Sequence, residues 1–136
     1  MIERILVGTD TSASADMAVT AAAEMARAND AELLVVYVRP EAESRHIADP
    51  KKAADPERYL RGLHTRFPGV RTRTREERGD PARRICAVAA EEGTDLVVVG
   101  NRGVRDRRAF RRERVPNAVV RSSPCSVLGV DTRVAQ

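Results

Sequence analysis

Aromatic residues are scarce in this chain, and no tryptophan occurs among its 136 residues. Only 3% of the residues are aromatic, whereas 42% are hydrophobic, so valine, leucine, isoleucine, alanine and methionine must fill the core. This composition is typical of a parallel sheet covered by helices. It argues against a β-sandwich or a β-barrel.

Long apolar runs are also missing. No stretch approaches the roughly 20 residues that cross a bilayer, and Met1 to Arg4 leads directly into a short apolar strand rather than into a signal-peptide core. We therefore expect a cytoplasmic protein without a membrane association. Cys86 and Cys125 lie far apart in the sequence and form no metal-binding spacing, so both are expected to be reduced packing residues.

Motifs that position chemistry are missing as well. The sequence contains neither a G-x-S-x-G nucleophile elbow nor a Walker lysine motif, and it shows no paired catalytic carboxylates. His46 and His64 lie far apart in the sequence and have no cysteine near them, so no metal site is expected. These absences predict a protein that is not an enzyme.

Apolar strands and helical segments alternate along the chain. Strand patterns are followed by helix patterns four times, which predicts an α/β fold with an open, mostly parallel five-stranded sheet of order 3-2-1-4-5 and helices on both faces. We expect one Rossmann-like, nucleotide-binding type of domain over residues 1–136. The expected strands are Ile2–Gly8, Glu32–Val38, Val70–Glu77, Leu96–Gly100 and Ser126–Val130, and the expected helices are Ala15–Ala28, Pro56–Phe67, Pro81–Glu92 and Pro116–Arg121, with fraying from Asp131 onward.

Two polar, glycine-containing segments follow the first and fourth expected strands. In the predicted order these strands are neighbours, so Gly8-Thr9-Asp10 and Gly100-Asn101-Arg102-Gly103 would meet at the switch point where open α/β sheets bind ligands. Asp10 is suited either to hold a ligand hydroxyl or to cap the first helix. The pattern predicts a crevice that handles a phosphorylated ligand.

The basic charge of the chain is concentrated in one segment. Residues 102–114 hold seven arginines against two acidic residues, a local balance of +5 in a chain whose net charge is +4. This segment is consistent with a solvated surface, with a clamp on phosphates, or with a patch for an anionic polymer. Phe110 is its only aromatic residue, so a stacking platform for nucleic acid is not expected.

Taken in order, several segments resemble the universal stress protein family over nearly the whole chain. They are Ile5–Asp10 with Ser12, Leu33–Val38, Gly79-Asp80-Pro81, Asp95–Gly103, Val115–Val119 and Ser123–Val127. The resemblance implies a nucleoside site that includes Thr9, Asp10 and the backbone around Val38. It also implies a homodimer formed through the last strand, Ser126–Val130, as is common in the family.

The phosphate end departs from the pattern of ATP-binding family members. That pattern is glycine, two residues, glycine, nine residues, glycine and then serine or threonine; Gly100 and Gly103 match it, but Glu113 and Arg114 occupy the last two positions. A side chain there hinders the close approach of backbone N–H groups to a phosphate. The candidate nucleotide-binding residues are Thr9, Asp10, Val38, Gly100, Arg102, Gly103, Arg114 and Val115.

Three functions remain open on these grounds. The first is a stress-response binding or signalling module with a degenerate ATP site. The second is an adenine-nucleotide binder, with ATP or another adenine nucleotide and magnesium only as its companion, in which the Arg-rich segment replaces the phosphate turn and slow hydrolysis occurs. The third is an interaction protein whose basic segment binds an acidic partner or nucleic acid.

Overall fold

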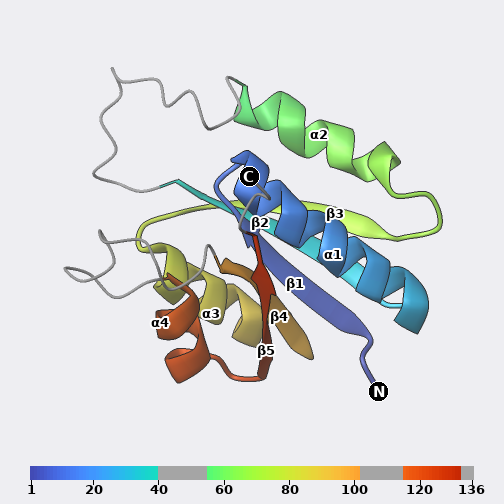
Figure 1. Ribbon diagram of the computed structural model, residues 1–136. Coiled ribbons are helices and arrows are strands. Elements are labelled where there is room, and N and C mark those ends of the chain that lie inside the picture. Colours follow the sequence, from blue (N-terminus) through green and yellow to red (C-terminus); the bar gives the residue numbers. More distant parts are fainter. Residues whose placement is uncertain (40–54, 102–114, 133–136) are drawn as a thin grey trace.

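The computed structural model describes residues 1–39, 55–101 and 115–132. In this part of the chain, five strands form one sheet of order β3-β2-β1-β4-β5, and each of the four neighbouring pairs is parallel. The predicted fold class and strand order are confirmed (Figure 1). The elements are β1 (Arg4–Thr9), α1 (Ala13–Asn29), β2 (Glu32–Arg39), α2 (Pro56–Arg66), β3 (Thr72–Arg78), α3 (Pro81–Glu91), β4 (Leu96–Asn101), α4 (Val115–Ser122) and β5 (Ser126–Asp131).

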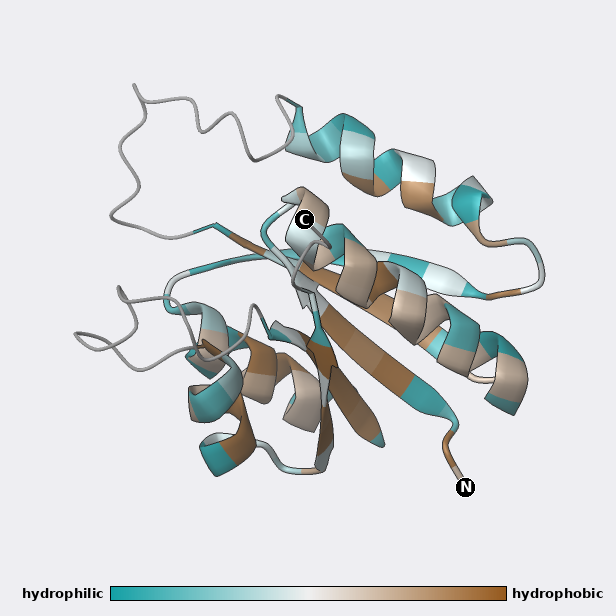
Figure 2. Cartoon of the chain, viewed as in Figure 1, coloured by the Kyte–Doolittle hydropathy of each residue, from teal (hydrophilic) through white to brown (hydrophobic). Residues whose placement is uncertain are grey.

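Helices cover both faces of the sheet, and the three central strands are apolar on both sides (Figures 1 and 2). Alternate strand residues face opposite sides: Ile5 and Val7 pack under α1 and α2, whereas Leu6 packs under α3 and α4. This burial on both faces explains the continuous apolar runs, such as Leu96–Val99, that mark the central strands.

Local signals set the ends of the helices. Ser12 caps α1, where its side chain accepts a hydrogen bond from the Ala15 N–H, and Asp30 ends the helix in the left-handed conformation. Asp80 caps α3 by accepting from the Arg83 N–H, with Pro81 in the first turn. The predicted start of the helix at Pro81 is thus confirmed, whereas α1 begins at Ala13, two residues before the predicted Ala15, directly after its cap Ser12.

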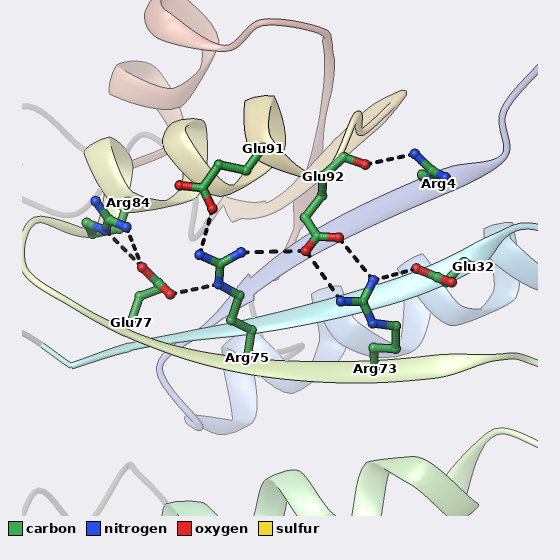
Figure 3. A network of polar contacts seen from close by, with 8 residues as sticks. All are labelled: Arg4, Glu32, Arg73, Arg75, Glu77, Arg84, Glu91 and Glu92. Atoms are coloured by element: carbon green, nitrogen blue, oxygen red, sulfur yellow. Dashed lines mark hydrogen bonds and ion pairs between the residues drawn. The ribbon is translucent and has the colours of Figure 1, made fainter.

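The edge strand β3 is built from charges instead of apolar residues. None of its seven residues, all within the described part of the chain, is buried. On the side facing α3, Arg73 bonds to Glu32 and Glu92, and Arg75 bonds to Glu77 and Glu91 (Figure 3). This ion network is completed by Arg84 on Glu77 and by Arg4 on the Glu92 carbonyl. It joins β3 to both ends of α3, because Arg84 lies near the start of the helix and Glu91 and Glu92 lie at its end.

The opposite edge, β5, is more apolar. It pairs with β4 in register from Ser126 opposite Leu96 to Asp131 opposite Asn101. Contrary to the expected fraying from Asp131, the strand includes Asp131, and Thr132 is buried with its N–H bonded to the Asn101 carbonyl at 3.0 Å. Ladder pairing with β4 and packing against α1 hold this end of the chain in place.

Candidate functional site

The carboxyl ends of β1 and β4 lie next to each other, and the next described helices, α1 and α4, cover opposite faces of the sheet. β1 pairs with β2 on one side and with β4 on the other, so the strand order reverses between β1 and β4. Parallel sheets bind ligands outside the carboxyl ends of their strands at this switch point. The structure therefore brings the first predicted segment, Gly8-Thr9-Asp10, beside Gly100 and Asn101, which are the first two residues of the second segment.

A compact polar turn connects β1 to α1. The Thr9 hydroxyl accepts a hydrogen bond from the Thr11 N–H, and an Asp10 carboxylate oxygen accepts one from the Ser12 N–H, both at 2.9 Å. The side chains of Thr9, Thr11 and Ser12 are buried, and Asp10 is half-buried. Asp10 thus fastens the turn just before the helix, while Ser12 caps α1. Because Ser12 is the cap of α1, Asp10 is not the cap, and its binding of a ligand hydroxyl stays a prediction.

Thr11 has a strained backbone. Its φ of 72° lies in the left-handed region, which a β-branched residue rarely adopts. Such strain persists only where the surroundings enforce it, and it is concentrated at functional sites. The turn at the end of β1 is thus held in a conformation that its own sequence does not favour.

Gly100 admits a side chain from the end of β5. A Cβ atom at Gly100 would lie 3.1 Å from Cγ2 of Thr132 and 3.6 Å from Cβ of Ala18, so the glycine leaves room for Thr132 to pack between β4 and α1. Thr132 is 2% exposed, and its hydroxyl has no hydrogen-bond partner among the described residues. No sequence pattern predicts this buried hydroxyl, because Thr132 follows the last expected strand.

The other candidate residues lie farther from the turn or outside the description. Val38 is buried in β2 on the face covered by α3, opposite Glu77 of β3. Val115 is exposed at the start of α4. Arg102, Gly103 and Arg114, like Glu113, lie outside the described residues. The described residues therefore include those predicted for a nucleoside, Thr9, Asp10 and Val38, whereas most of those predicted for the phosphates lie outside the described ranges.

A polar cluster between α1 and α2 was missed by the sequence analysis. Both terminal nitrogens of Arg66 donate to the Asp16 carboxylate, one of them at 2.8 Å, and the Tyr59 hydroxyl donates to the same carboxylate. Arg66 also donates to the Thr20 hydroxyl at 3.0 Å. Tyr59, Leu63 and Arg66 share one face of α2 by their spacing, a signal that places Arg66 beside the core.

Ionisation within this cluster is set by the same contacts. The hydrogen bonds from Arg66 hold the pKa of Asp16 below its ordinary value of 3.8, against the opposing effect of burial. Burial, reinforced by the bond to Asp16, raises the pKa of Tyr59. The phenol therefore remains protonated and acts as a donor at neutral pH.

Residues 1–39, 55–101 and 115–132 contain no group of three or more histidine, cysteine or acidic side chains arranged to hold a metal ion. Within the same ranges, every helix is too short or too polar to cross a membrane.

The fold is that of a parallel α/β protein with a polar turn at its switch point, and comparisons with known proteins identify the family. The family model described as "Universal stress protein family" matches residues 1–131. A putative universal stress protein of Staphylococcus haemolyticus is 32% identical, over 96% of this chain and 85% of its own length. Universal stress protein YxiE of Bacillus subtilis is 27% identical, over 94% and 98%. The chain belongs to the universal stress protein family.

Solved structures agree with this assignment. A universal stress protein crystallised in complex with cAMP has a TM-score of 0.79 and 28% identity, with 96% of this chain and 98% of that chain covered. An Arabidopsis thaliana family protein with AMP bound has a TM-score of 0.72 at 21% identity, with 98% and 93% covered, and so supports the fold. The resemblance stated from sequence motifs is confirmed.

Proposed function

We propose that this protein is a cytoplasmic, non-catalytic binding and signalling module of the stress response that holds an adenine nucleotide at the carboxyl ends of β1 and β4. The observation that supports this proposal most directly is the strained, hydrogen-bonded turn from Thr9 to Ser12, which lies beside Gly100 at the switch point. Its half-buried carboxylate, Asp10, is suited to accept a hydrogen bond from a ribose hydroxyl. The complex of a relative with cAMP, at 28% identity, supports this ligand class.

The described residues fit the nucleoside half of such a ligand. Polar groups gather where the ribose would lie, and the buried Thr132 hydroxyl leaves a hydrogen-bonding group unused within the described residues. The carboxyl end of β2 around Val38 would supply backbone groups to the base. For the phosphate end we propose, on the family pattern alone, Arg102, Gly103, Arg114 and Val115.

The phosphate end is proposed to disfavour ATP. Glu113 and Arg114 stand where ATP-binding family members have glycine and serine or threonine. The Glu113 carboxylate would repel a triphosphate, and a side chain in place of glycine obstructs backbone N–H groups. A nucleoside monophosphate, linear or cyclic, makes the smallest demand on this end. We therefore assign this class of ligand rather than ATP.

Calorimetric titration with AMP, cAMP, GMP and Mg-ATP at two salt concentrations tests the proposal. We expect an adenine monophosphate to bind at least tenfold more tightly than ATP, with a preference over GMP that persists at high salt. The double substitution Glu113→Gly and Arg114→Ser should raise the affinity for ATP.

The absence of heat with every adenine nucleotide would refute the proposal, and equal affinity for ATP would favour the alternative in which the Arg-rich segment replaces the phosphate turn. Affinity that depends on salt but not on the base would favour the interaction-protein alternative.

We further propose that β5 pairs with a second copy of the chain. This edge strand carries apolar residues, and the Leu128 side chain is 36% exposed on a face that α1 leaves open. A Cβ atom at Gly129 would meet nothing within 4 Å, so the face of the sheet is also open at this position of the strand. Edge strands of this kind expose backbone groups that another chain satisfies.

A further inference from the structure

Thr132, which follows β5, packs against the end of β4 with both its backbone and its side chain. Its N–H donates to the Asn101 carbonyl at 3.0 Å and so extends the pairing of β4 with β5 by one residue. Its side chain is 2% exposed, and its Cγ2 methyl is 3.1 Å from the position of a Cβ atom at Gly100. Thr132 thus restrains the two residues with which β4 enters the candidate site.

This packing accounts for the glycine at position 100. Among the described residues, the glycines with a positive φ are Gly69, Gly79 and Gly93, so the backbone of Gly100 does not require glycine. Carbon atoms in contact prefer a separation of about 3.5–4.0 Å. A side chain at position 100 would therefore push against the Thr132 methyl, which the hydrogen bond of its own backbone restrains.

The helix α1 bounds the same space. The Cβ position at Gly100 is 3.6 Å from Cβ of Ala18, a fully buried residue of α1. The methyl groups of Thr132 and Ala18 therefore both lie within 4 Å of one point above Gly100. Val130, two residues before Thr132, packs against the same core cluster as Ala18, which places this side of β5 under α1.

Thr132 thereby fills space between the two elements that form the candidate site. β4 ends in Gly100 and Asn101, and α1 begins directly after the polar turn from Thr9 to Ser12. Protein interiors are close-packed, so one methyl group gained or lost between two elements shifts them relative to each other. The Thr132 side chain therefore sets how closely the end of β4 approaches α1 and the turn.

We propose that Thr132 is a positioning residue of the nucleotide site: its methyl group and its N–H fix the end of β4 relative to α1, and Gly100 is glycine in order to admit that methyl group. This inference rests on the proposed function, because it concerns the same site. A nucleotide that contacts both the turn and the end of β4 binds with full affinity only when their separation matches the ligand.

A double-mutant cycle tests the proposal, with the dissociation constant for AMP and the midpoint of urea unfolding as its two measurements. Thr132→Ser removes the methyl group and keeps the hydroxyl, Gly100→Ala adds a methyl group, and the double variant moves one methyl group across the same contact. We expect Gly100→Ala to weaken AMP binding about fivefold to tenfold, Thr132→Ser about threefold, and the double variant to bind within about threefold of the unchanged protein.

Thr94→Ser is the matched control. Thr94 is buried at the opposite end of β4, where its N–H donates to the Ala89 carbonyl at 3.0 Å. Loss of its methyl group should lower the urea midpoint and leave the affinity for AMP unchanged. A loss of affinity equal to that of Thr132→Ser would overturn the positioning role, because any buried methyl group would then suffice.

The outcomes separate this inference from the proposed function. If the unchanged protein binds AMP and the losses from Gly100→Ala and Thr132→Ser multiply in the double variant, the ligand itself requires the glycine. The positioning role is then refuted while the proposed function stands. If the unchanged protein binds no adenine nucleotide, the proposed function fails and the urea midpoints decide alone: additive shifts of the midpoint overturn the packing of Thr132 on Gly100.

Discussion

Thr11 shows at the scale of one residue how the candidate site stores strain. Its left-handed φ of 72° would suit glycine better than threonine. We expect Thr11→Gly to be more stable than Thr11→Ala by about 1 kcal/mol, since both remove the side chain but only glycine also removes the penalty of the left-handed backbone. Urea unfolding of the two variants measures the difference directly.

The Ala variant serves as the control for the loss of side-chain packing at this buried position. Equal stability of the two variants, or a more stable Ala variant, would show that the turn is not strained. The sequence places Thr9, Asp10 and Ser12 at this turn because they follow an apolar strand. It does not reveal the strain, because the residue that needs the left-handed conformation is neither glycine nor asparagine.

At the scale of an element, the ion network replaces apolar packing between β3 and α3 (Figure 3). Hydrogen bonds from Arg84 and Arg75 lower the pKa of Glu77 from its ordinary value of 4.5, and those from Arg73 lower the pKa of Glu92. A carboxyl group whose pKa is lower in the folded state favours folding when ionised. Its contribution is complete above pH 4.5 and is lost as the pH falls below that value.

Replacement of both Glu77 and Glu92 by Gln should therefore flatten the fall in stability below pH 4.5. At pH 7 we expect a loss of roughly 1 kcal/mol, in keeping with partly exposed ion pairs. Unfolding in urea at pH 3.5 and pH 7 provides the measurement. Glu57→Gln is the control, since the 3.9 Å pair of Glu57 with Arg61 is exposed and local to α2. An unchanged pH slope in the double variant would count against the network.

A strand can be predicted from the sequence where its burial determines the pattern of apolar residues along it. β1, β2 and β4 are buried on both faces, which yields the continuous apolar runs from which they were predicted. β3 was predicted from Val70 to Glu77 by its alternating charges but spans Thr72–Arg78, because Val70 packs into the core before the strand begins. The ion pairs themselves depend on which face of α3 meets β3, and no local pattern encodes that contact.

The candidate site was predictable in the same way. The switch point follows from the strand order, and Thr9, Asp10 and Gly100 were placed there in advance. Tyr59 was assigned to the buried side of its helix, but its contact with Asp16 joins residues 43 positions apart. Thr132 was missed because pairing with β4 continues one residue past the apolar pattern of β5. Such contacts are products of tertiary packing.

At the scale of the whole molecule, β5 is the proposed contact between two copies. Leu128→Glu places a charge at this edge, and we expect it to convert a dimer into a monomer because the charge would be buried without a partner. Val120→Glu on α4 is the matched control, since Val120 is exposed at 64% on a helix rather than on the strand edge. Sedimentation equilibrium at high micromolar concentration gives the mass. A monomeric unchanged protein, or a Leu128→Glu dimer, contradicts the proposed contact.

The central claim concerns an adenine nucleotide at the turn after β1, and two aspartates offer a matched comparison. Asp10 accepts the Ser12 N–H at the carboxyl end of the sheet, and Asp95 accepts the N–H groups of Glu3 and Arg4 at the start of β1, the opposite end. Removal of either carboxylate deletes bonds to the backbone. Only Asp10 lies where the nucleotide is proposed to bind.

The decisive measurement is the calorimetric affinity for AMP of the unchanged protein, Asp10→Ala and Asp95→Ala. The account predicts that Asp10→Ala weakens binding about tenfold, the equivalent of about 1.4 kcal/mol, while Asp95→Ala binds as the unchanged protein does. Equal affinities of all three proteins, or no binding by the unchanged protein, would contradict a nucleotide site at the carboxyl end of β1.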